Sequence, residues 1–230
     1  MKILAIESSA KSASVAVCED RALLTQYFQS TGLTHSRTLL KMAEDMLKNA
    51  DLSIRGMDVV AVASGPGSFT GIRIGVSAAI GLAWGADLPV CGVSTLEAMA
   101  YNAEEPGYVV CPVMDARRDQ VYTASFLNPD GSLTRLTPDR ALSLNELTGE
   151  AMKDGRPYLL LGDGALKCHE AFMAAGIACR LAPPLLRPQS AWGVACASLN
   201  APKLTPDALR PNYLRLSQAE RERAEKAAKA

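Results

Sequence analysis

The sequence predicts an α/β protein of two lobes, each a mixed sheet flanked by helices. Residues 3–7 form an apolar run that ends in an acid, followed by a short polar turn and an alternating strand, and residues 108–126 repeat this order. Two hairpins can also look alike by chance. The continuous apolar run 57–63, followed by a glycine-rich loop and a helix, is typical of a buried parallel strand. With 230 residues and 48% hydrophobic content, the chain can bury a sizeable core.

The first lobe, residues 1–104, opens with three strand-like stretches, 1–7, 12–18 and 22–29, which imply two hairpins. Apolar residues at helical spacing predict a helix over 35–50, with Thr34 as its N-cap. A strand over 57–63, a loop and a helix to Gly85 follow. A strand over 88–93 then leads to a short helix through Ala100 that Ser94 can cap.

The second, smaller lobe is expected over residues 105–216. Its predicted strands are 108–115, 120–126, 158–161 and 177–181, its helices end near Ala175 and Leu199, and its turn is 162–164. The tail, 217–230, is charged with almost no apolar face. It is expected to be a frayed helix or disordered.

Composition excludes several classes of function. Lys plus Arg equals Asp plus Glu, 24 against 24, and aromatic residues are 5% of the chain, so a nucleic-acid-binding module is not favoured. The six cysteines form no CxxC pair and are expected to be reduced. The first apolar run is too short for a signal peptide, and no stretch is expected to approach a membrane span. The expected location is the cytoplasm.

The most unusual segment is GPGSFTGIRIG, residues 65–75, between a buried strand and a helix. Backbone amides at such a junction can bind an anion. However, no GK[ST] follows, and glycines at 65, 67 and 71 do not fit GxGxxG. The alternative is structural: Gly65 and Gly67 allow a tight turn, and Gly71, Gly75 and Ala79 give the helix a flat side for close packing.

Four segments together carry a resemblance that covers residues 1–215. GPGSFTGIRIG, PVCGVSTLEAM (residues 89–99), IESS (6–9) and PNYLR (211–215) resemble the TsaB family, also called YeaZ. The signature residues of the first segment are Gly65, Pro66, Gly67, Ser68, Phe69, Thr70, Gly71 and Arg73. The resemblance implies an ASKHA fold, the architecture of actin, sugar kinases and Hsp70, and a complex with TsaD and TsaE. That complex transfers threonylcarbamoyl to the adenosine beside the anticodon of tRNAs that read codons beginning with A.

The resemblance also implies a lost metal site. TsaD has a similar GPG loop and then HHMEGH, whose HxxxH pair binds metal because histidines at i and i+4 share one helix face. Here Thr95 and Met99 stand at those two positions, and neither is a good ligand for such an ion. We therefore expect no metal, no catalytic residue and no cofactor of the chain's own.

Glu7, Ser8 and Ser9, with Asp115 in the second lobe, occupy the hairpins where ASKHA enzymes contact phosphate or metal. A catalytic protein would use them in that way. This hairpin has no glycine to let the backbone approach a phosphate, which favours vestigial structure.

A partner surface is expected on the two helices 35–50 and 71–85. Methionines on the first helix adapt to different partners, and small residues on the second let another helix approach. The alternative is that these residues pack on their own sheet. The expected contact residues are His35, Leu39, Met42, Ala43, Met46, Gly71, Gly75 and Ala79.

Two functions from different classes follow. The first is a non-catalytic scaffold that forms a heterodimer with TsaD, contacts TsaE more weakly through that pair, and meets tRNA only indirectly. The second is an active ASKHA enzyme, either an ATP-dependent transferase or a metallopeptidase. The sequence leaves open whether the chain alone is a homodimer and whether a nucleotide binds at the joint with TsaD.

Overall fold

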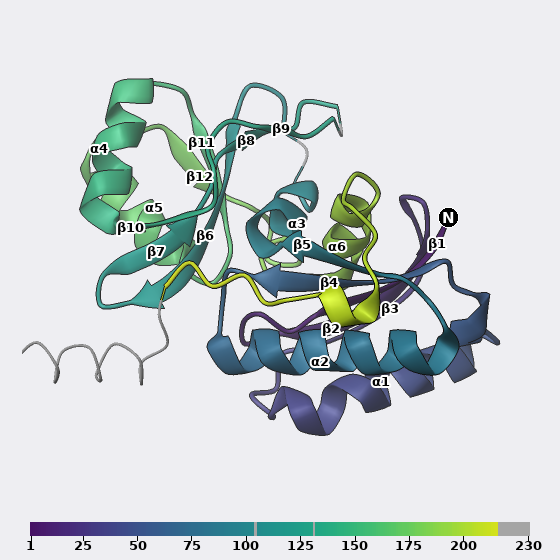
Figure 1. The fold of residues 1–230 in the computed structure, drawn as a ribbon. Helices are drawn as coiled ribbons and strands as arrows, with labels where there is room; N and C mark the ends of the chain where they lie inside the picture. The colour runs from purple at the N-terminus through teal and green to yellow at the C-terminus, as the bar shows by residue number, and fades with distance from the viewer. Residues whose placement is uncertain (104, 131, 216–230) are drawn as a thin grey trace, which may run out of the picture.

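The computed structural model describes residues 1–103, 105–130 and 132–215, and within them the chain forms two lobes side by side (Figure 1). In this described part of the chain, each lobe is built on its own mixed sheet, with five strands in the first sheet and seven in the second, of which five lie in one continuous order. The expectation of a frayed or disordered tail over 217–230 lies outside the described residues.

The first sheet has the strand order β3-β2-β1-β4-β5. Its strands are β1 (Lys2–Glu7), β2 (Ala13–Glu19), β3 (Ala22–Gln29), β4 (Val59–Gly65) and β5 (Val90–Ser94). β1 pairs antiparallel with β2 and parallel with β4, so it is the central strand of the sheet. Its residues are buried on both faces, which explains why the run shows no polar alternation.

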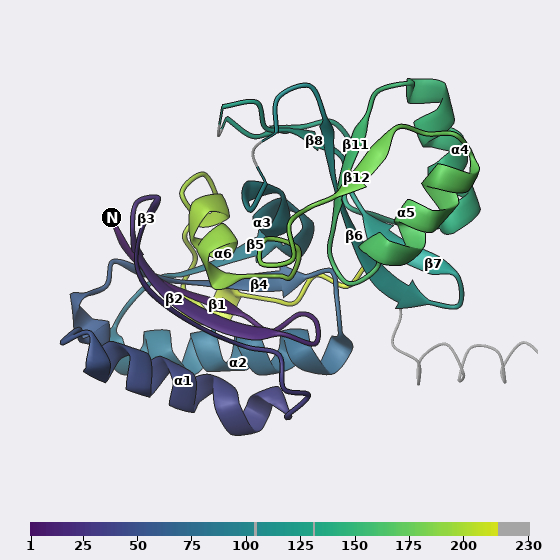
Figure 2. The same ribbon diagram turned by 180° about the vertical axis from the view of Figure 1, so that it is seen from behind.

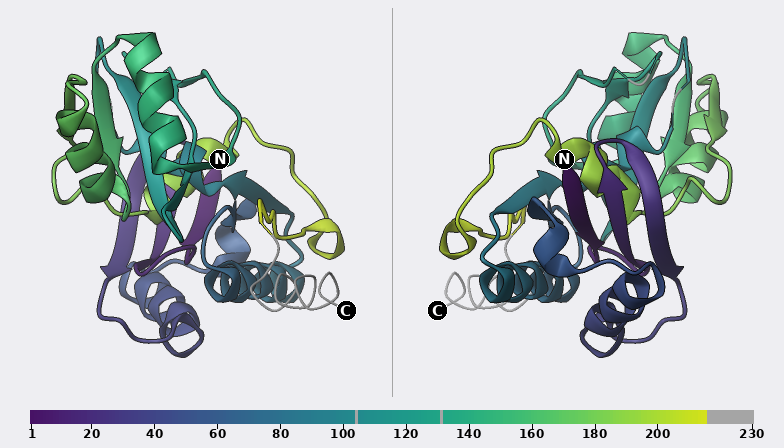
Figure 3. Two further views of the ribbon diagram at one scale, coloured as in Figure 1. Left: turned by 90° about the vertical axis from the view of Figure 1, so that its left-hand side faces the viewer. Right: turned by 90° about the vertical axis from the view of Figure 1, so that its right-hand side faces the viewer.

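Helices cover both faces of this sheet (Figures 1 and 2). Leu4 and Ile6 of β1 join a core with α1 (His35–Asn49) and α2 (Phe69–Ala86), whereas Ile3 and Ala5 join a core with α3 (Thr95–Tyr101) and α6 (Ala191–Ser198). Figure 3 shows α1 and α2 next to each other beneath the sheet. The short 3-10 turn η1 (Ile54–Gly56) leads into β4.

The second sheet repeats the topology of the first. Its strands are β6 (Val109–Arg117), β7 (Gln120–Thr123), β8 (Phe126–Leu127), β9 (Thr134–Arg135), β10 (Arg140–Ser143), β11 (Tyr158–Leu161) and β12 (Cys179–Leu181). In the path β10-β7-β6-β11-β12 the central strand is β6, which is antiparallel to β7 and parallel to β11, just as β1 is antiparallel to β2 and parallel to β4. α4 (Leu144–Asp154) and α5 (Ala165–Ala174) pack on one face. The duplicated two-lobe α/β fold is confirmed.

Most predicted elements are present, but the structure differs from the expectation in several places, and β9 and β10 were not predicted. Thr34 is the N-cap residue of α1, but its side chain makes no capping hydrogen bond, whereas Ser94 caps α3 as expected. The strand expected over 120–126 is interrupted, because β7 ends at Thr123 and β8 begins at Phe126. The sequence analysis missed α4, although Ser143 and Glu146 form a capping box at its start.

The end of the chain returns to the first lobe. α6, which was expected with the second lobe, packs against β1 and β2 through Val194 and Ala195. Leu204 then bridges Val90, and Leu209, after the short 3-10 turn η2 (Pro206–Ala208), is buried between α2 and the first sheet. The bounds of the two lobes stay a prediction, but residues 191–209 contact the first sheet.

The residues expected on the partner surface mostly face inward, so that expectation is wrong for them. The buried ones are Leu39, Ala43, Met46, Gly71, Gly75 and Ala79, while Met42 is partly buried against the same core. On α2 the cause is close packing, since a Cβ added at Gly71 would overlap the carbonyl oxygen of Ser8 and one at Gly75 would overlap the Ser8 hydroxyl. The flat side of α2 therefore serves its own lobe.

One helix, α2, bears on the expectation about membrane spans. Among the described residues it is the one helix that is long and apolar enough to cross a membrane by length and composition alone. Its residues Ile72, Val76 and Ala83 are buried against the first sheet. One face of α2 therefore packs on the first sheet.

We predict opposite effects from alanine at two glycines of α2. Gly71→Ala should lower the free energy of unfolding by about 2 kcal/mol or more, because the carbonyl of Ser8 is backbone and cannot move aside. Gly81→Ala should raise it by about 1 kcal/mol, because a Cβ there meets no atom and alanine favours the helix. Urea unfolding followed by circular dichroism measures both. Equal effects of the two variants would contradict the packing described here.

Candidate functional site

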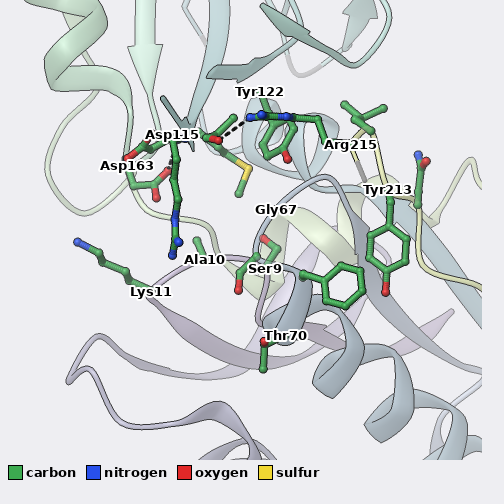
Figure 4. Close-up of a pocket in the computed structure, with 17 residues that line it drawn as sticks. Ser9, Ala10, Lys11, Gly67, Thr70, Asp115, Tyr122, Asp163, Tyr213 and Arg215 are labelled. Atoms are coloured by element: carbon green, nitrogen blue, oxygen red, sulfur yellow. Dashed lines mark hydrogen bonds between the residues drawn. The ribbon is translucent and has the colours of Figure 1, made fainter. Parts of the chain in front are cut away.

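A cavity of about 580 Å³ lies between the two lobes. Ser9, Ala10 and Thr70 line its wall on the first lobe, and Asp115, Tyr122 and Asp163 line the opposite wall (Figure 4). Residues 212–215 line it as well. The cavity therefore joins three of the segments that the sequence analysis singled out: the turn after β1, the GPGSFTG loop and the PNYLR segment.

The GPGSFTG loop is held by contacts within the protein. The backbone N–H of Ser68 donates to the carbonyl of Ser9 at 2.6 Å, and the N–H of Gly71 donates to the Ser68 hydroxyl, which caps α2. Gly67 lies so close to Ser9 that a side chain would overlap the Ser9 carbonyl oxygen. The peptide bond between Gly65 and Pro66 is cis. These contacts support the structural interpretation of the glycines.

The turn after β1 is closed around a buried carboxylate. Oε1 of Glu7 accepts hydrogen bonds from the Ser9 backbone N–H and the Ser9 hydroxyl, both at 2.6 Å, while Oε2 is buried without a hydrogen-bond partner. The Ser8 hydroxyl donates to the carbonyl of Gly71 at 2.9 Å. Because both serines are engaged within the fold, their side chains are not directed at a ligand.

Burial controls the ionisation of Glu7. Removal of the carboxyl from water raises its pKa from 4.5 to about 7, although the hydrogen bonds from Ser9 act in the opposite direction. Glu7 is not accessible from the cavity, since its side chain is only 1% exposed and does not line the cavity. The hypothesis that this hairpin is vestigial remains a prediction, and the burial of Glu7 and its bonds to Ser9 support it.

The β6–β7 turn forms the matching wall in the second lobe. Oδ1 of Asp115 accepts from the Arg117 backbone N–H at 2.7 Å, and Oδ1 of Asp163 accepts from the Asp115 backbone N–H at 3.3 Å. Arg117, Arg118 and Asp119 all have positive φ angles, so the turn is tight. Unlike Glu7, Asp115 is exposed and borders the cavity. The structure thus brings Asp115 and the Ser9 turn together across the cleft.

The PNYLR segment meets the GPGSFTG loop at the edge of the cavity. The rings of Tyr213 and Phe69 stack with centroids 4.6 Å apart, and the Arg73 guanidinium lies 3.8 Å from the Phe69 ring centroid and donates to the Tyr213 hydroxyl. The Asn212 backbone N–H donates to the Ser64 carbonyl at 2.7 Å. The sequence analysis quoted PNYLR but gave these residues no role, because nothing in a linear motif shows which other motif it contacts.

The two positions that the sequence analysis compared with metal ligands are part of the core. Thr95 and Met99 are 0% and 1% exposed, and Met99 packs with Leu96, Val110 and Leu161 between the lobes. Within the part of the chain that the structure describes, no group of three or more His, Cys, Asp or Glu side chains could hold a metal ion. The Thr95 and Met99 side chains are therefore packed in the core, where the Thr95 hydroxyl has no hydrogen-bond partner among the described residues.

His35, one of the expected partner contacts, also contacts the turn after β1. It is the first residue of α1, and its Nε2 lies 2.7 Å from the carbonyl oxygen of Ala10, so it ties the helix start to the turn after β1. The histidine therefore has a structural contact.

We predict that Glu7→Gln removes a pH dependence of stability. The pKa of Glu7 is about 7 in the folded chain and 4.5 when the carboxyl is exposed. Between pH 4.5 and pH 7 the folded chain therefore binds more protons at Glu7 than the unfolded chain does. Stability contributed by protonated Glu7 is therefore full below about pH 4.5 and is lost as the pH rises toward 7, by about 3 kcal/mol in total. Glutamine keeps the acceptor for Ser9 without the charge.

Urea unfolding of both proteins at pH 5 and pH 8 measures this effect. The wild-type chain should lose more stability than the variant between the two values, so that Glu7→Gln is the more stable protein at pH 8. An identical pH dependence in the two proteins would contradict the buried carboxylate.

Comparison with known proteins assigns the family. A family model described as "TsaD: tRNA N6-adenosine threonylcarbamoyltransferase" matches residues 29–221. The "tRNA threonylcarbamoyladenosine biosynthesis protein TsaB" of Bacillus subtilis is 34% identical over 162 residues, which are 70% of this chain and 71% of the relative.

Solved structures agree with this similarity. "YeaZ from Pseudomonas aeruginosa" superposes with a TM-score of 0.76 at 25% identity, covering 93% of this chain and 99% of the other. Component A of the (R)-2-hydroxyglutaryl-CoA dehydratase of Acidaminococcus fermentans has a TM-score of 0.50 at 12% identity over 87% and 97% of the chains, a likeness of fold alone. The fold is of the ASKHA type, and the chain belongs to the TsaB (YeaZ) family.

Proposed function

We propose that this chain is a non-catalytic partner subunit in the synthesis of threonylcarbamoyladenosine in tRNA. It holds a TsaD-type transferase in its active form and performs none of the chemistry itself. The kinship with proteins named for this biosynthesis supports the pathway, and the packing between the lobes supports the absence of catalysis.

The single observation that carries the proposal is the position of Met99. A Cβ added at Gly162 would lie 2.7 Å from the Met99 Cε, so the methionine side chain reaches from α3 to the start of the turn after β11. An apolar side chain packed in this way excludes a hydrated divalent ion from the site. Glu97, on the same helix, is paired with Arg135 at 2.6 Å.

The partner surface is proposed on the outward faces of α1 and α2. On α2, Ser77, Gly81 and Gly85 are exposed at i, i+4 and i+8, and Trp84 beside them is 65% exposed. Leu40 on α1 is 52% exposed. Ser77, Gly81 and Gly85 form a stripe of small residues beside an exposed aromatic side chain. The sequence analysis had instead expected the contact stripe at Gly71, Gly75 and Ala79.

The occupant proposed for this surface is a TsaD-type chain. The family model that matches this chain is that of the transferase itself, so the partner carries equivalent helices. Like helices can pair about a pseudo-two-fold axis, and a second copy of this chain could pair in the same way. TsaE would contact the pair more weakly, and tRNA would be bound through TsaD, in the cytoplasm. A nucleotide at the joint stays a prediction.

An active ASKHA enzyme, ATP-dependent transferase or metallopeptidase, is the alternative function. The open cavity with Asp115 and Asp163 on one wall favours it. Against it stand the buried Glu7, the hydrogen-bonded amides of Ser68 and Gly71, and the absence of imidazole ligands at Thr95 and Met99.

We predict that transfer of threonylcarbamoyl to tRNA by TsaD and TsaE requires this chain, and that this chain alone transfers none. Reconstitution with threonylcarbamoyl-adenylate and tRNA, followed by mass spectrometry of the nucleosides, measures the modified adenosine. Product formed at an undiminished rate without the chain would contradict the scaffold function. Product formed by this chain alone would make it an enzyme.

A matched pair of variants tests the surface in the same assay. Trp84→Glu should reduce product formation at least tenfold, because it places a charge at the proposed joint. Leu166→Glu is the control, since Leu166 is 56% exposed on α5 in the second lobe. Equal activity of the two variants would contradict the assignment of the partner surface to α1 and α2. It would not contradict the scaffold function.

A further inference from the structure

The last described residues run from the first lobe across the cavity to the second (Figures 1 and 4). We call residues 209–215 the strap. Its first residue, Leu209, is 2% exposed and lies in the core between α2 and the first sheet. A Cβ added at Gly92 would meet the Leu209 side chain at 2.7 Å, so Leu209 packs directly against the backbone of β5.

Two further contacts hold the strap on the first lobe. The Asn212 N–H donates to the Ser64 carbonyl at the end of β4, and the Asn212 carbonyl lies where a side chain at Gly65 would be. The Tyr213 ring then stacks on Phe69 at the start of α2, with Arg73 bonded to its hydroxyl. Glycine at 65 is required by this close approach of the strap.

Arg215 is the contact with the second lobe. Its Nη1 donates to the Ala116 carbonyl at 2.7 Å, two residues before the tip of the β6–β7 turn. On the far side of the cavity, α3 joins the lobes through Leu96 and Met99. The lobes are thus connected at the back by a buried helix and at the front by the strap.

We propose that the strap locks the two lobes in one relative arrangement, with Arg215 as its fastening on the second lobe. Two-lobed folds of this kind can close and open about a hinge, and a bond across the open side opposes such motion. A charge-assisted hydrogen bond supported by an aromatic stack is strong enough to select one arrangement. The strap concerns the isolated chain and does not depend on the proposed function.

Hydrogen exchange of the full chain tests the fastening. Arg215→Ala should speed exchange of the amides of residues 116–120 about tenfold, because the loss of one charge-assisted bond changes a local opening equilibrium by that order. Arg210→Ala is the control, since Arg210 donates to the carbonyls of Asp207 and Leu209 within the first-lobe part of the chain. It should leave exchange at 116–120 unchanged. Unchanged exchange in Arg215→Ala would overturn the proposal.

A distance measurement tests the locking itself. Spin labels at Ser36→Cys on α1 and Glu170→Cys on α5, with the partly exposed Cys179 replaced by serine, report the separation of the lobes. Arg215→Ala and, independently, Tyr213→Ala should broaden the distance distribution and shift it to longer distances, whereas Arg210→Ala should not. Should one of the first two variants fail to fold, the other decides. A distance distribution that stays narrow and unshifted in a folded variant would overturn the proposal that the strap locks the lobes.

Discussion

The contact between the start of α2 and the turn after β1 determines much of the arrangement around the cleft. The backbone of α2 lies directly on Ser8, with glycines at 71 and 75 because no Cβ fits there. Ser8 in turn donates to Gly71, and Ser9 is bonded both to Glu7 and to Ser68. The contact fixes where α2 begins, and hence where Phe69 and Arg73 meet Tyr213.

The same contact engages backbone amides that an anion-binding loop would leave free. An amide donates a hydrogen bond to a phosphate only if it is free, and those of Ser68 and Gly71 already have partners. Glu7, which ends β1, is bonded to its own turn rather than to a ligand. Met99 fills the space between the lobes with apolar contacts. These contacts support the proposed scaffold function, in which the chain presents a fixed surface to its partner.

Local patterns predicted the fold well, and contacts between distant segments were the part that they could not predict. The apolar run before Glu7 and the cap at Ser94 are local signals, and both elements formed as expected. The small residues of α2 were recognised, but spacing alone gives a face and not its neighbour, so Gly75 was assigned outward. α4 was missed although Ser143 and Glu146 mark its start. The contact of Tyr213 with Phe69 joins residues 144 positions apart, and no local rule reports it.

The metal content of the purified chain tests the central claim most directly, because the claim is that core side chains occupy the place of the metal ligands. Inductively coupled plasma mass spectrometry after dialysis should find no stoichiometric zinc or iron, since neither Thr95 nor Met99 can replace the imidazoles that compensate for dehydration of the ion. One equivalent of tightly held metal per chain, lost in Thr95→Ala or Glu97→Ala, would contradict the account and place the protein among the enzymes of its fold.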